Sequence, residues 1–501
     1  SSLRQAKRHA RGKVVLSRLI VLKKVRKKVM KDGTVTESVK RRLLLNLKRS
    51  GITDASVKTE KVELPRMLDV VFDALELLRR ARGSGKTLRF LVLDFRHAFF
   101  QFPVTPREQK YFAARVRSWI VMWVRAVQGS RGAPLICGRG LALSMRLTGA
   151  TLTEGATSSS TYVDDPLSTF VGDTASQERD MAKMVGGLLA LGFRLSFEKS
   201  QDSDVAGTIT WTSGRLTFLP DLEAIRVEVK EEILAELTEN IDAMMASVSI
   251  SLEDLRAIAG RATCVSSLIH TWRPFVSMLW GPLYSTRSRC WFKPDHVWRT
   301  AVEIPLRWMR AFLAGACGTL SRTYTLAEYL GEGMQVDVTS DASPTGIGAF
   351  LTEDGVITRF FAAKLTQDDA MRLKTELGSS RGQQIWEAFC VLCALRLWAP
   401  VWRTRRIRLR VKSDSVAALI MVVKMRCSGE GFSIVARELA LDIGEALYEP
   451  GVAAHLPGQA NTIADDLSRL GEPGHLCVPK QLANAQRDSL PSRSAEWWRT
   501  L

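Results

Sequence analysis

Cysteine is scarce in this sequence, and long apolar runs are absent. Eight cysteines are scattered over 501 residues, which is typical of a reducing compartment. One Cys-x-x-Cys pair, Cys390 and Cys393, lies in an apolar segment without a second pair, so we do not expect a zinc site. No apolar run approaches 18 residues, and the N-terminus has neither a signal-peptide core nor an initiator Met. We therefore expect a fragment or processed piece of an intracellular protein, in cytoplasm or nucleus, that is not secreted and does not span a membrane.

Acidic residues are almost absent from residues 1–50, which hold 17 Lys/Arg and only Asp32 and Glu37. The whole chain has a formal net charge of +19, and +15 of it falls in this segment. Such a charge indicates a polyanionic partner, nucleic acid first and an anionic membrane surface second. With 46% hydrophobic residues, the chain has ample core material, which rules out wholesale disorder.

Strand-like and helix-like patterns alternate along the chain and predict an α/β multidomain protein. Residues 1–50 alternate basic and β-branched residues and predict two strands joined by a turn at Asp32-Gly33. Ser251 and Asp254 form a predicted capping box that opens a helix. We expect helices over 65–82, 176–192 and 383–398, strands over 89–95, 118–124 and 405–414, and a hairpin over 209–218. The predicted domains are 1–220 (α/β), 221–330 (mainly helical) and 331–470 (α/β), followed by a tail over 471–501.

Three carboxylates stand out in the first domain. Asp94 ends an apolar strand, and Asp164 and Asp165 lie in a predicted tight hairpin, TYVDDPLST. By itself the Asp-Asp pair is more simply interpreted as an ordinary surface turn. Adjacent like charges repel, however, and two metal ions bridged by carboxylates from two strands would neutralise them and activate phosphoryl transfer. Mg²⁺ suits this role because it takes oxygen ligands and keeps positions open for substrate phosphates.

The surroundings of these acids resemble the reverse transcriptases of gypsy- and DIRS-type retroelements. The resemblance implies a right-hand polymerase with fingers, palm and thumb, a helical connection, and two Mg²⁺ (or Mn²⁺) ions per active site. Seven segments match in the family's order: KRRLLLNLKRSGI (40–52), VELPRMLDVV (62–71), LVLDFRHAFFQFPV (91–104), VQGSRGAPLI (127–136), YVDD (162–165), LGFRLSFEKS (191–200) and WTSGRLTF (211–218).

The same resemblance implies roles for individual residues. Asp94, Asp164 and Asp165 would be catalytic metal ligands. Arg42, with Arg41 as a second candidate, would contact the triphosphate, and Gln128 would line the nucleotide site. Phe99 would exclude ribonucleotides, and Lys199 would assist the leaving pyrophosphate. The sequence departs from the family's pattern at positions that touch no expected metal ligand and bear on rate and fidelity: Asn46, His97, Ala133 and Pro166.

Four more carboxylates occur between 331 and 470: one on a strand, one on an apolar helix, one at a strand end and one at a helix start. An acid in an apolar helix is costly to bury unless it is paired or bound to a cation. This block, with its ending HLPGQANTIADDLSR, resembles ribonuclease H of the same retroelements. The resemblance implies metal-dependent cleavage of RNA in RNA–DNA hybrids, with these catalytic metal ligands: Asp341, Glu387, Asp414 and Asp465.

Two neighbouring acids remain less favoured alternatives in this set, Asp337 for Asp341 and Asp466 for Asp465. Because no His lies between Gly458 and Asp465, we do not expect the mobile catalytic His of some ribonucleases H. We assign structural roles to His97, His270 and His455. The arginines over 403–410 are compatible with a solvated edge strand or with a contact to hybrid backbone.

The sequence therefore predicts a retroelement RNA-directed DNA polymerase with an associated ribonuclease H. Its expected partners are an RNA template, a DNA primer, RNA–DNA hybrid and dNTPs. Two alternatives stay open: a decayed or domesticated copy that only binds nucleic acid, and a copy active only as a ribonuclease H. Residues 331–470 carry a net charge of −1, so hybrid would be held mainly at the basic N-terminal end.

Overall fold

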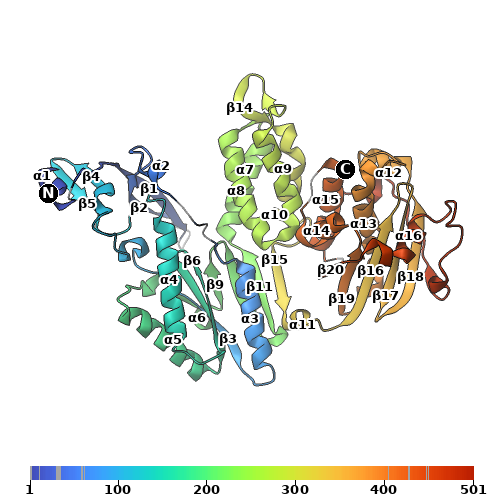
Figure 1. Cartoon of the computed structure of the whole chain (residues 1–501), viewed down its shortest axis with the longest axis horizontal. Coiled ribbons are helices and arrows are strands. Elements are labelled where there is room, and N and C mark those ends of the chain that lie inside the picture. Colours follow the sequence, from blue (N-terminus) through green and yellow to red (C-terminus); the bar gives the residue numbers. More distant parts are fainter. Residues whose placement is uncertain are drawn as a thin grey trace. The chain divides into compact units, whose positions relative to one another are not determined.

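The computed structural model describes residues 3–10, 12–29, 35–57, 60, 63–403, 405–426, 429–446, 448 and 451–500. It divides into two compact units, Ser1–Thr212 with Leu216–Pro220 and Ser213–Arg215 with Asp221–Leu501. Each unit mixes helices and strands (Figure 1), so the predicted mixed α/β, multidomain organisation is confirmed. The predicted boundary at 330 falls inside the second unit.

A four-stranded sheet forms the core of the first unit, in the order β6-β7-β3-β8 with antiparallel neighbours. Phe170 of β7 and Leu91 of β3 pack under α4 and α5, while α3 packs against β6 and β7. Both central strands are almost wholly buried, as expected for strands covered on two faces. The elements are α3 (Met67–Ala81), β3 (Thr87–Val92), α4 (Ala133–Gly149), β6 (Thr157–Tyr162), β7 (Asp165–Gly172), α5 (Thr174–Ala190), β8 (Gln201–Asp202), α6 (Ser203–Ala206) and β9 (Thr208–Trp211).

The basic N-terminal segment forms a long antiparallel hairpin, β1 (Arg18–Val29) with β2 (Val35–Asn46), in the register Arg18↔Asn46 to Val29↔Val35. The strand prediction for this segment is confirmed, and the predicted Asp32-Gly33 turn lies outside the described residues. The buried end of β2, at Leu45, joins a small apolar cluster. The neighbouring elements are α1 (Leu3–His9), α2 (Ile52–Ala55), β4 (Ala113–Val116) and β5 (Trp119–Met122).

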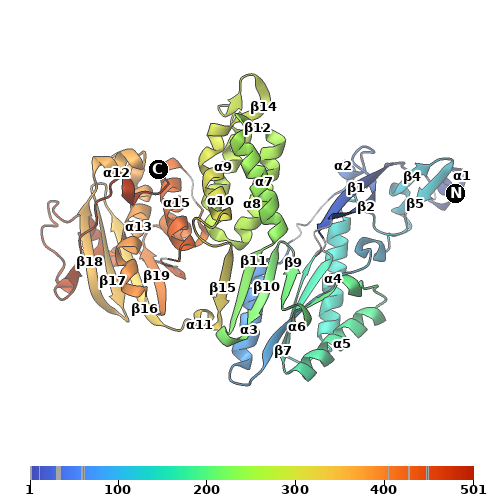
Figure 2. The same cartoon turned by 180° about the vertical axis from the view of Figure 1, so that it is seen from behind.

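The second unit begins with a helical part, as predicted. The predicted capping box of α8 is confirmed, because Ser251 Oγ accepts the Asp254 N–H at 3.0 Å and donates to the Asp254 carboxylate at 2.6 Å. A three-stranded sheet, β12-β14-β13, lies at one end of these helices (Figure 2). Strand β10 (Gly214–Leu219) has residues in both units. The other elements of this part are β11 (Ala224–Val229), α7 (Glu231–Ala246), β12 (Ser249–Ser251), α8 (Leu252–Leu268), α9 (Arg273–Tyr284), β13 (Arg289–Cys290), β14 (Lys293–Trp298), α10 (Glu303–Leu313), β15 (Ser321–Thr325) and α11 (Leu326–Tyr329).

A six-stranded mixed sheet, in the order β20-β19-β16-β17-β18-β21, completes the second unit. Strand β16 pairs in parallel with β19 and antiparallel with β17. Helix α13 is long and apolar enough to cross a membrane. However, 67% of its most apolar 18-residue stretch is buried inside the protein, as in the core helix of a folded domain. The elements are β16 (Met334–Ala342), β17 (Gly346–Glu353), β18 (Val356–Lys364), α12 (Gln367–Arg372), α13 (Gln383–Trp402), β19 (Ile407–Ser413), α14 (Val416–Lys424), α15 (Glu430–Gly444), β20 (Val452–His455), α16 (Thr462–Ser468) and β21 (Gln486–Arg487).

The predicted tail over 471–501 is built into this second sheet domain rather than trailing from it. Strand β21 pairs in parallel with β18. Arg493 donates to the buried Asp369 carboxylate at 2.7 Å, and Trp498 stacks on Phe389 with ring centroids 5.5 Å apart. The sheet domain therefore extends to the last described residues.

Candidate functional site

The first acidic centre consists of Asp94, Asp164 and Asp165. Strands β3 and β7 run antiparallel with Val92 opposite Leu167, and the Leu93 N–H donates to the Pro166 carbonyl at 3.1 Å. The end of β3 therefore lies beside the start of β7. Because Asp94 follows β3 and Asp165 opens β7, the sheet brings the three predicted acids to one edge.

The hairpin that carries the acid pair is tight and strained. Tyr162 pairs with Asp165 across a two-residue turn, and Val163 in that turn has φ 56°, a conformation that is unfavourable for a β-branched residue. Trp211 contacts this turn in two ways. Its buried indole N–H donates to the Asp165 main-chain oxygen at 2.9 Å, and its ring packs edge-on against the ring of Tyr162. Sequence reasoning missed this contact.

The charges of the first centre influence one another. The pKa of the Asp164 carboxyl is raised, mainly by burial and further by the charge of Asp94, while Arg42 on β2 acts in the opposite direction. The Lys199 ammonium donates to the Asp94 carboxylate at 3.0 Å. A carboxyl whose pKa is raised by burial and by a second acid is a common feature of functional sites.

The predicted substrate-binding residues are partly brought together. Arg42 acts electrostatically on Asp164, whereas Arg41, its neighbour on the same strand, points to the opposite face of the hairpin. Gln128 lies beside the end of β2, where its carbonyl accepts the Leu45 N–H at 3.2 Å. Gly129 is required there, because it has φ 103° and a Cβ would come within 2.5 Å of the Leu45 oxygen.

Phe99 is half-buried and packs on the apolar core beneath α4. Its predicted role against the sugar of a nucleotide stays a prediction.

The second acidic centre consists of Asp341, Glu387, Asp414 and Asp465. Strands β16 and β19 run parallel with Thr339 opposite Lys412, so their ends carry Asp341 and Asp414 to the same edge. Glu387 projects from α13 and Asp465 from α16. Both helices pack against β16 and β17.

Burial and mutual repulsion dominate this centre. Asp341 is only 6% exposed, and its pKa is raised to about 7, mainly by burial and further by Asp414, Asp465 and Glu387, against a hydrogen bond from Ser468. The pKa of Glu387 is also raised, mainly by burial and further by Asp414. These effects show that the four predicted acids form one electrostatic cluster.

One carboxylate oxygen of this cluster lacks a partner. Asp414 Oδ1 is buried without a hydrogen bond among the described residues, which is costly unless a cation or a proton reaches it. Arg469 donates to Asp465 at 2.7 Å and partly offsets its charge. The donor set fits a hard divalent cation, although no three His, Cys, Asp or Glu side chains within the described ranges are already arranged to hold one.

The two less favoured acids have other partners. Asp337 accepts from Arg410 and Lys412, each at 2.7 Å, and these cations hold its pKa below the usual range. Asp466 pairs with His475 at 2.8 Å. Each of these two acids therefore already has a basic partner of its own.

The backbone of His455, to which the sequence analysis assigned a structural role, lies next to the strand that leads into Asp414. It ends β20 opposite Ser413, the residue before Asp414, and its side chain is exposed. The only signal in the sequence was the position of this His immediately before Leu-Pro-Gly. The parallel register supplies what the sequence could not, namely that this end lies beside Asp414.

The structure bears on two further sequence interpretations. Strand β19 lies between β16 and β20, so it is not an edge strand. Arg410 on this strand forms an ion pair with Asp337. Cys390 and Cys393 are buried in α13, and burial raises the thiol pKa of Cys393 to about 12. The expectation that this pair binds no zinc stays a prediction.

Comparison with known proteins finds no matching family model and no similar curated protein. Among solved structures, the chain is similar to the foamy viral protease-reverse transcriptase dRH in complex with double-stranded DNA, with a TM-score of 0.42 and 16% identity over 87% of this chain and 66% of that chain. It is also similar to the foamy viral protease-reverse transcriptase in complex with RNA/DNA hybrid, with a TM-score of 0.42 and 14% identity over 94% of this chain and 54% of that chain. This chain thus spans between about half and two thirds of the length of those two chains.

Proposed function

We propose that this protein is an RNA-directed DNA polymerase of a gypsy- or DIRS-type retroelement, with an associated ribonuclease H. The observation that carries the proposal is that two separate sheets each gather acids distant in sequence into a mutually repelling, partly buried cluster. Such clusters cost stability unless they serve a cation. Phosphoryl transfer is the chemistry for which paired carboxylates with two metals are best suited.

In the first unit, Asp94, Asp164 and Asp165 would hold two Mg²⁺ or Mn²⁺ ions, and these ions would supply the charge stabilisation for attack of the primer 3′-hydroxyl on the α-phosphate of a dNTP. Arg42 would bind the triphosphate from the hairpin. Lys199, which donates to Asp94, would donate a proton to the leaving pyrophosphate or neutralise its negative charge. Gln128 would line the nucleotide site, and Phe99 would lie against the sugar and exclude ribonucleotides.

In the second unit, Asp341, Glu387, Asp414 and Asp465 would hold the ions that activate a water molecule for RNA-strand cleavage. His455 is exposed and ends the strand that pairs with the one before Asp414, which supports a role for it in transferring a proton to the leaving group. The fingers, palm and thumb would then be the N-terminal hairpin, the four-stranded sheet with its helices, and the helical part of the second unit. RNA template, DNA primer, RNA–DNA hybrid and dNTPs are the proposed partners.

Primer extension on an RNA template tests the polymerase. We expect extension with Mg²⁺ or Mn²⁺ that is lost in Asp164→Asn and kept in Asp204→Asn, which changes an exposed acid of the same unit. Absence of extension by the unmodified protein would remove the polymerase proposal and leave the binding-only or nuclease-only alternatives.

Hydrolysis of the RNA strand in a labelled hybrid tests the second centre. Asp466, which follows Asp465, and Asp337, on the same strand as Asp341, provide matched controls. We expect Asp465→Asn and Asp341→Asn to abolish cleavage, and Asp466→Asn and Asp337→Asn to retain it per folded molecule. Equal loss in both pairs would contradict the assignment, and cleavage unaffected by Asp164→Asn would show that the two centres act independently.

A further inference from the structure

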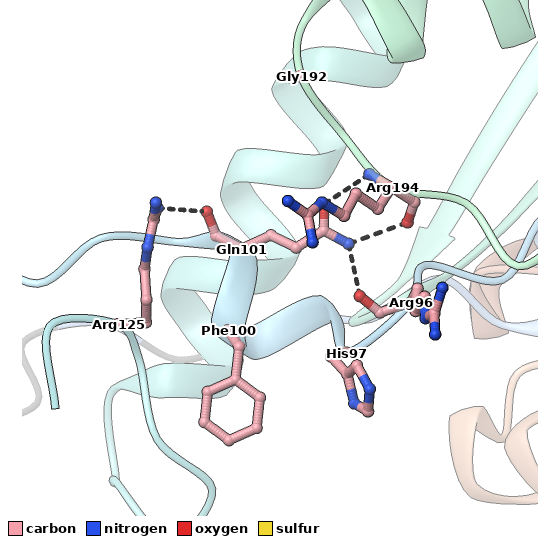
Figure 3. Close-up of a pocket in the computed structure, with 7 residues that line it drawn as sticks. All are labelled: Arg96, His97, Phe100, Gln101, Arg125, Gly192 and Arg194. Atoms are coloured by element: carbon pink, nitrogen blue, oxygen red, sulfur yellow. Dashed lines mark hydrogen bonds between the residues drawn. The ribbon is translucent and has the colours of Figure 1, made fainter.

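A basic cavity of about 740 Å³ lies in the first unit, just beyond the end of β3 (Figure 3). Its wall combines residues from three segments of the chain: the segment after Asp94, the segment before Gln128, and the loop after α5. The lining residues are Arg96, His97, Phe100, Gln101, Arg125, Gly192 and Arg194. None of the residues assigned above to catalysis or dNTP binding is among them.

The charge of this cavity is uncompensated. Its lining contains three arginines and no acid, and all three arginines are exposed. Among the described residues, none of the three forms an ion pair with a carboxylate, although many arginines elsewhere do. Three guanidinium groups around one concavity repel each other unless an anion is present.

The cavity is also preformed, because the side chain of Gln101 joins its segments. The Gln101 amide donates to the carbonyl oxygens of Arg96 at 2.9 Å and Arg194 at 3.0 Å, and its oxygen accepts the Arg194 N–H at 2.8 Å. Arg125 donates from Nη1 to the Gln101 main-chain oxygen at 3.1 Å (Figure 3). Fixing the backbone in advance reduces the ordering cost of binding.

We propose that this cavity is a phosphate-binding site that takes the polyphosphate of a nucleotide, separate from the dNTP bound at the acidic centre. Guanidinium groups bind phosphate oxygens through paired, charge-assisted hydrogen bonds. The volume lies in the range of small-ligand pockets, and the half-buried Phe100 ring on its wall offers a surface for a base. A cluster around one cavity fits a compact anion better than an extended strand, whose contacts would follow a track.

Titration calorimetry in the presence of EDTA tests this proposal independently of polymerisation. The probes are ATP and inorganic tripolyphosphate, added to the full chain and to the Asp164→Asn variant. We expect both probes to bind both proteins. Arg194→Gln should weaken both by about tenfold, as the loss of one charge-assisted contact implies. The matched control is Arg115→Gln, which removes an exposed arginine of β4 outside the cavity and should change neither affinity.

Two further arms identify the source of the phosphate. Phe100→Leu should weaken ATP binding and leave tripolyphosphate binding unchanged, because only ATP has a base. Single-stranded DNA with or without a 5′-phosphate should bind to wild type and Arg194→Gln alike. The proposal is overturned if neither probe binds saturably, if Arg115→Gln has the same effect as Arg194→Gln, or if Arg194→Gln weakens only the DNA.

Discussion

Trp211 is expected to act on catalysis without touching substrate. The strained turn at Val163 costs on the order of 1–3 kcal/mol, and it presents Asp164 only while its neighbours hold it. The Trp211 indole is 1% exposed and supplies the hydrogen bond at 2.9 Å to the Asp165 carbonyl. Trp211→Phe keeps an aromatic ring but removes this donor, which costs about 1 kcal/mol for the bond alone.

The expected result is a fall in kcat for primer extension of about fivefold, since about 1.4 kcal/mol corresponds to one decade in rate and the lost hydrogen bond is worth about 1 kcal/mol. The KM for dNTP should change little, because the nucleotide-binding residues are untouched. Hybrid cleavage by the second unit should stay unchanged. Single-turnover primer extension with varied dNTP concentration measures both constants.

Trp272→Phe is the matched control. Trp272 is fully buried, and its indole N–H has no hydrogen-bond partner among the described residues, so this substitution removes the same volume without removing a bond. If both variants lose the same fraction of kcat at similar thermal stability, the effect comes from the smaller buried side chain in general, and the positioning role of Trp211 is refuted.

Three other predictions concern the second unit. Asp341→Asn should raise the melting temperature while abolishing cleavage, because it removes a buried carboxylate that Asp414, Asp465 and Glu387 repel; a lowered melting temperature would contradict this. Arg493→Met should destabilise the unit by about 3 kcal/mol in denaturant titrations, because it leaves the 2%-exposed Asp369 carboxylate unpaired, and a change below about 1 kcal/mol would argue against an essential tail. His270 has a folded-state pKa lowered to about 3 by burial and by Arg322 and Arg273, so the unfolded state binds its proton more readily. The contribution of His270 to the free energy of unfolding should be fully present above pH 6.5. It should fall by about 1.4 kcal/mol per pH unit between about pH 6.5 and pH 3, and His270→Gln should flatten this dependence.

The sequence predicts those features that depend on local pattern. The strand ending at Asp94, the acid turn at Asp164 and Asp165, and the capping box at Ser251 all follow from residue type and spacing. Local pattern does not reveal which partner a side chain meets across the sheet. Asp337 and Asp341 share a strand face and differ only in their neighbours, because the parallel register places Arg410 and Lys412 beside Asp337.

The same limit explains the residues that were overlooked or left open. His455 comes to lie beside Ser413 through pairing with a strand about 40 residues earlier in the sequence. The tail joins the sheet domain through single contacts, such as Trp498 on Phe389 and Arg493 on Asp369. Long-range contacts of this kind leave no periodicity in the sequence, so only the folded chain shows them.

The two acidic centres manage their negative charge in different ways. Near the first, basic side chains are already present: Lys199 contacts Asp94, and Arg42 acts on Asp164 from the hairpin. In the second, burial raises the pKa of Asp341 to about 7, and Asp414 Oδ1 has no hydrogen-bond partner among the described residues. Residues 331–470 carry a net charge of −1, whereas residues 1–50 carry +15. Under the proposed function, nucleic acid would therefore be attracted mainly to the N-terminal hairpin, and the affinity of the second centre for hybrid would be modest.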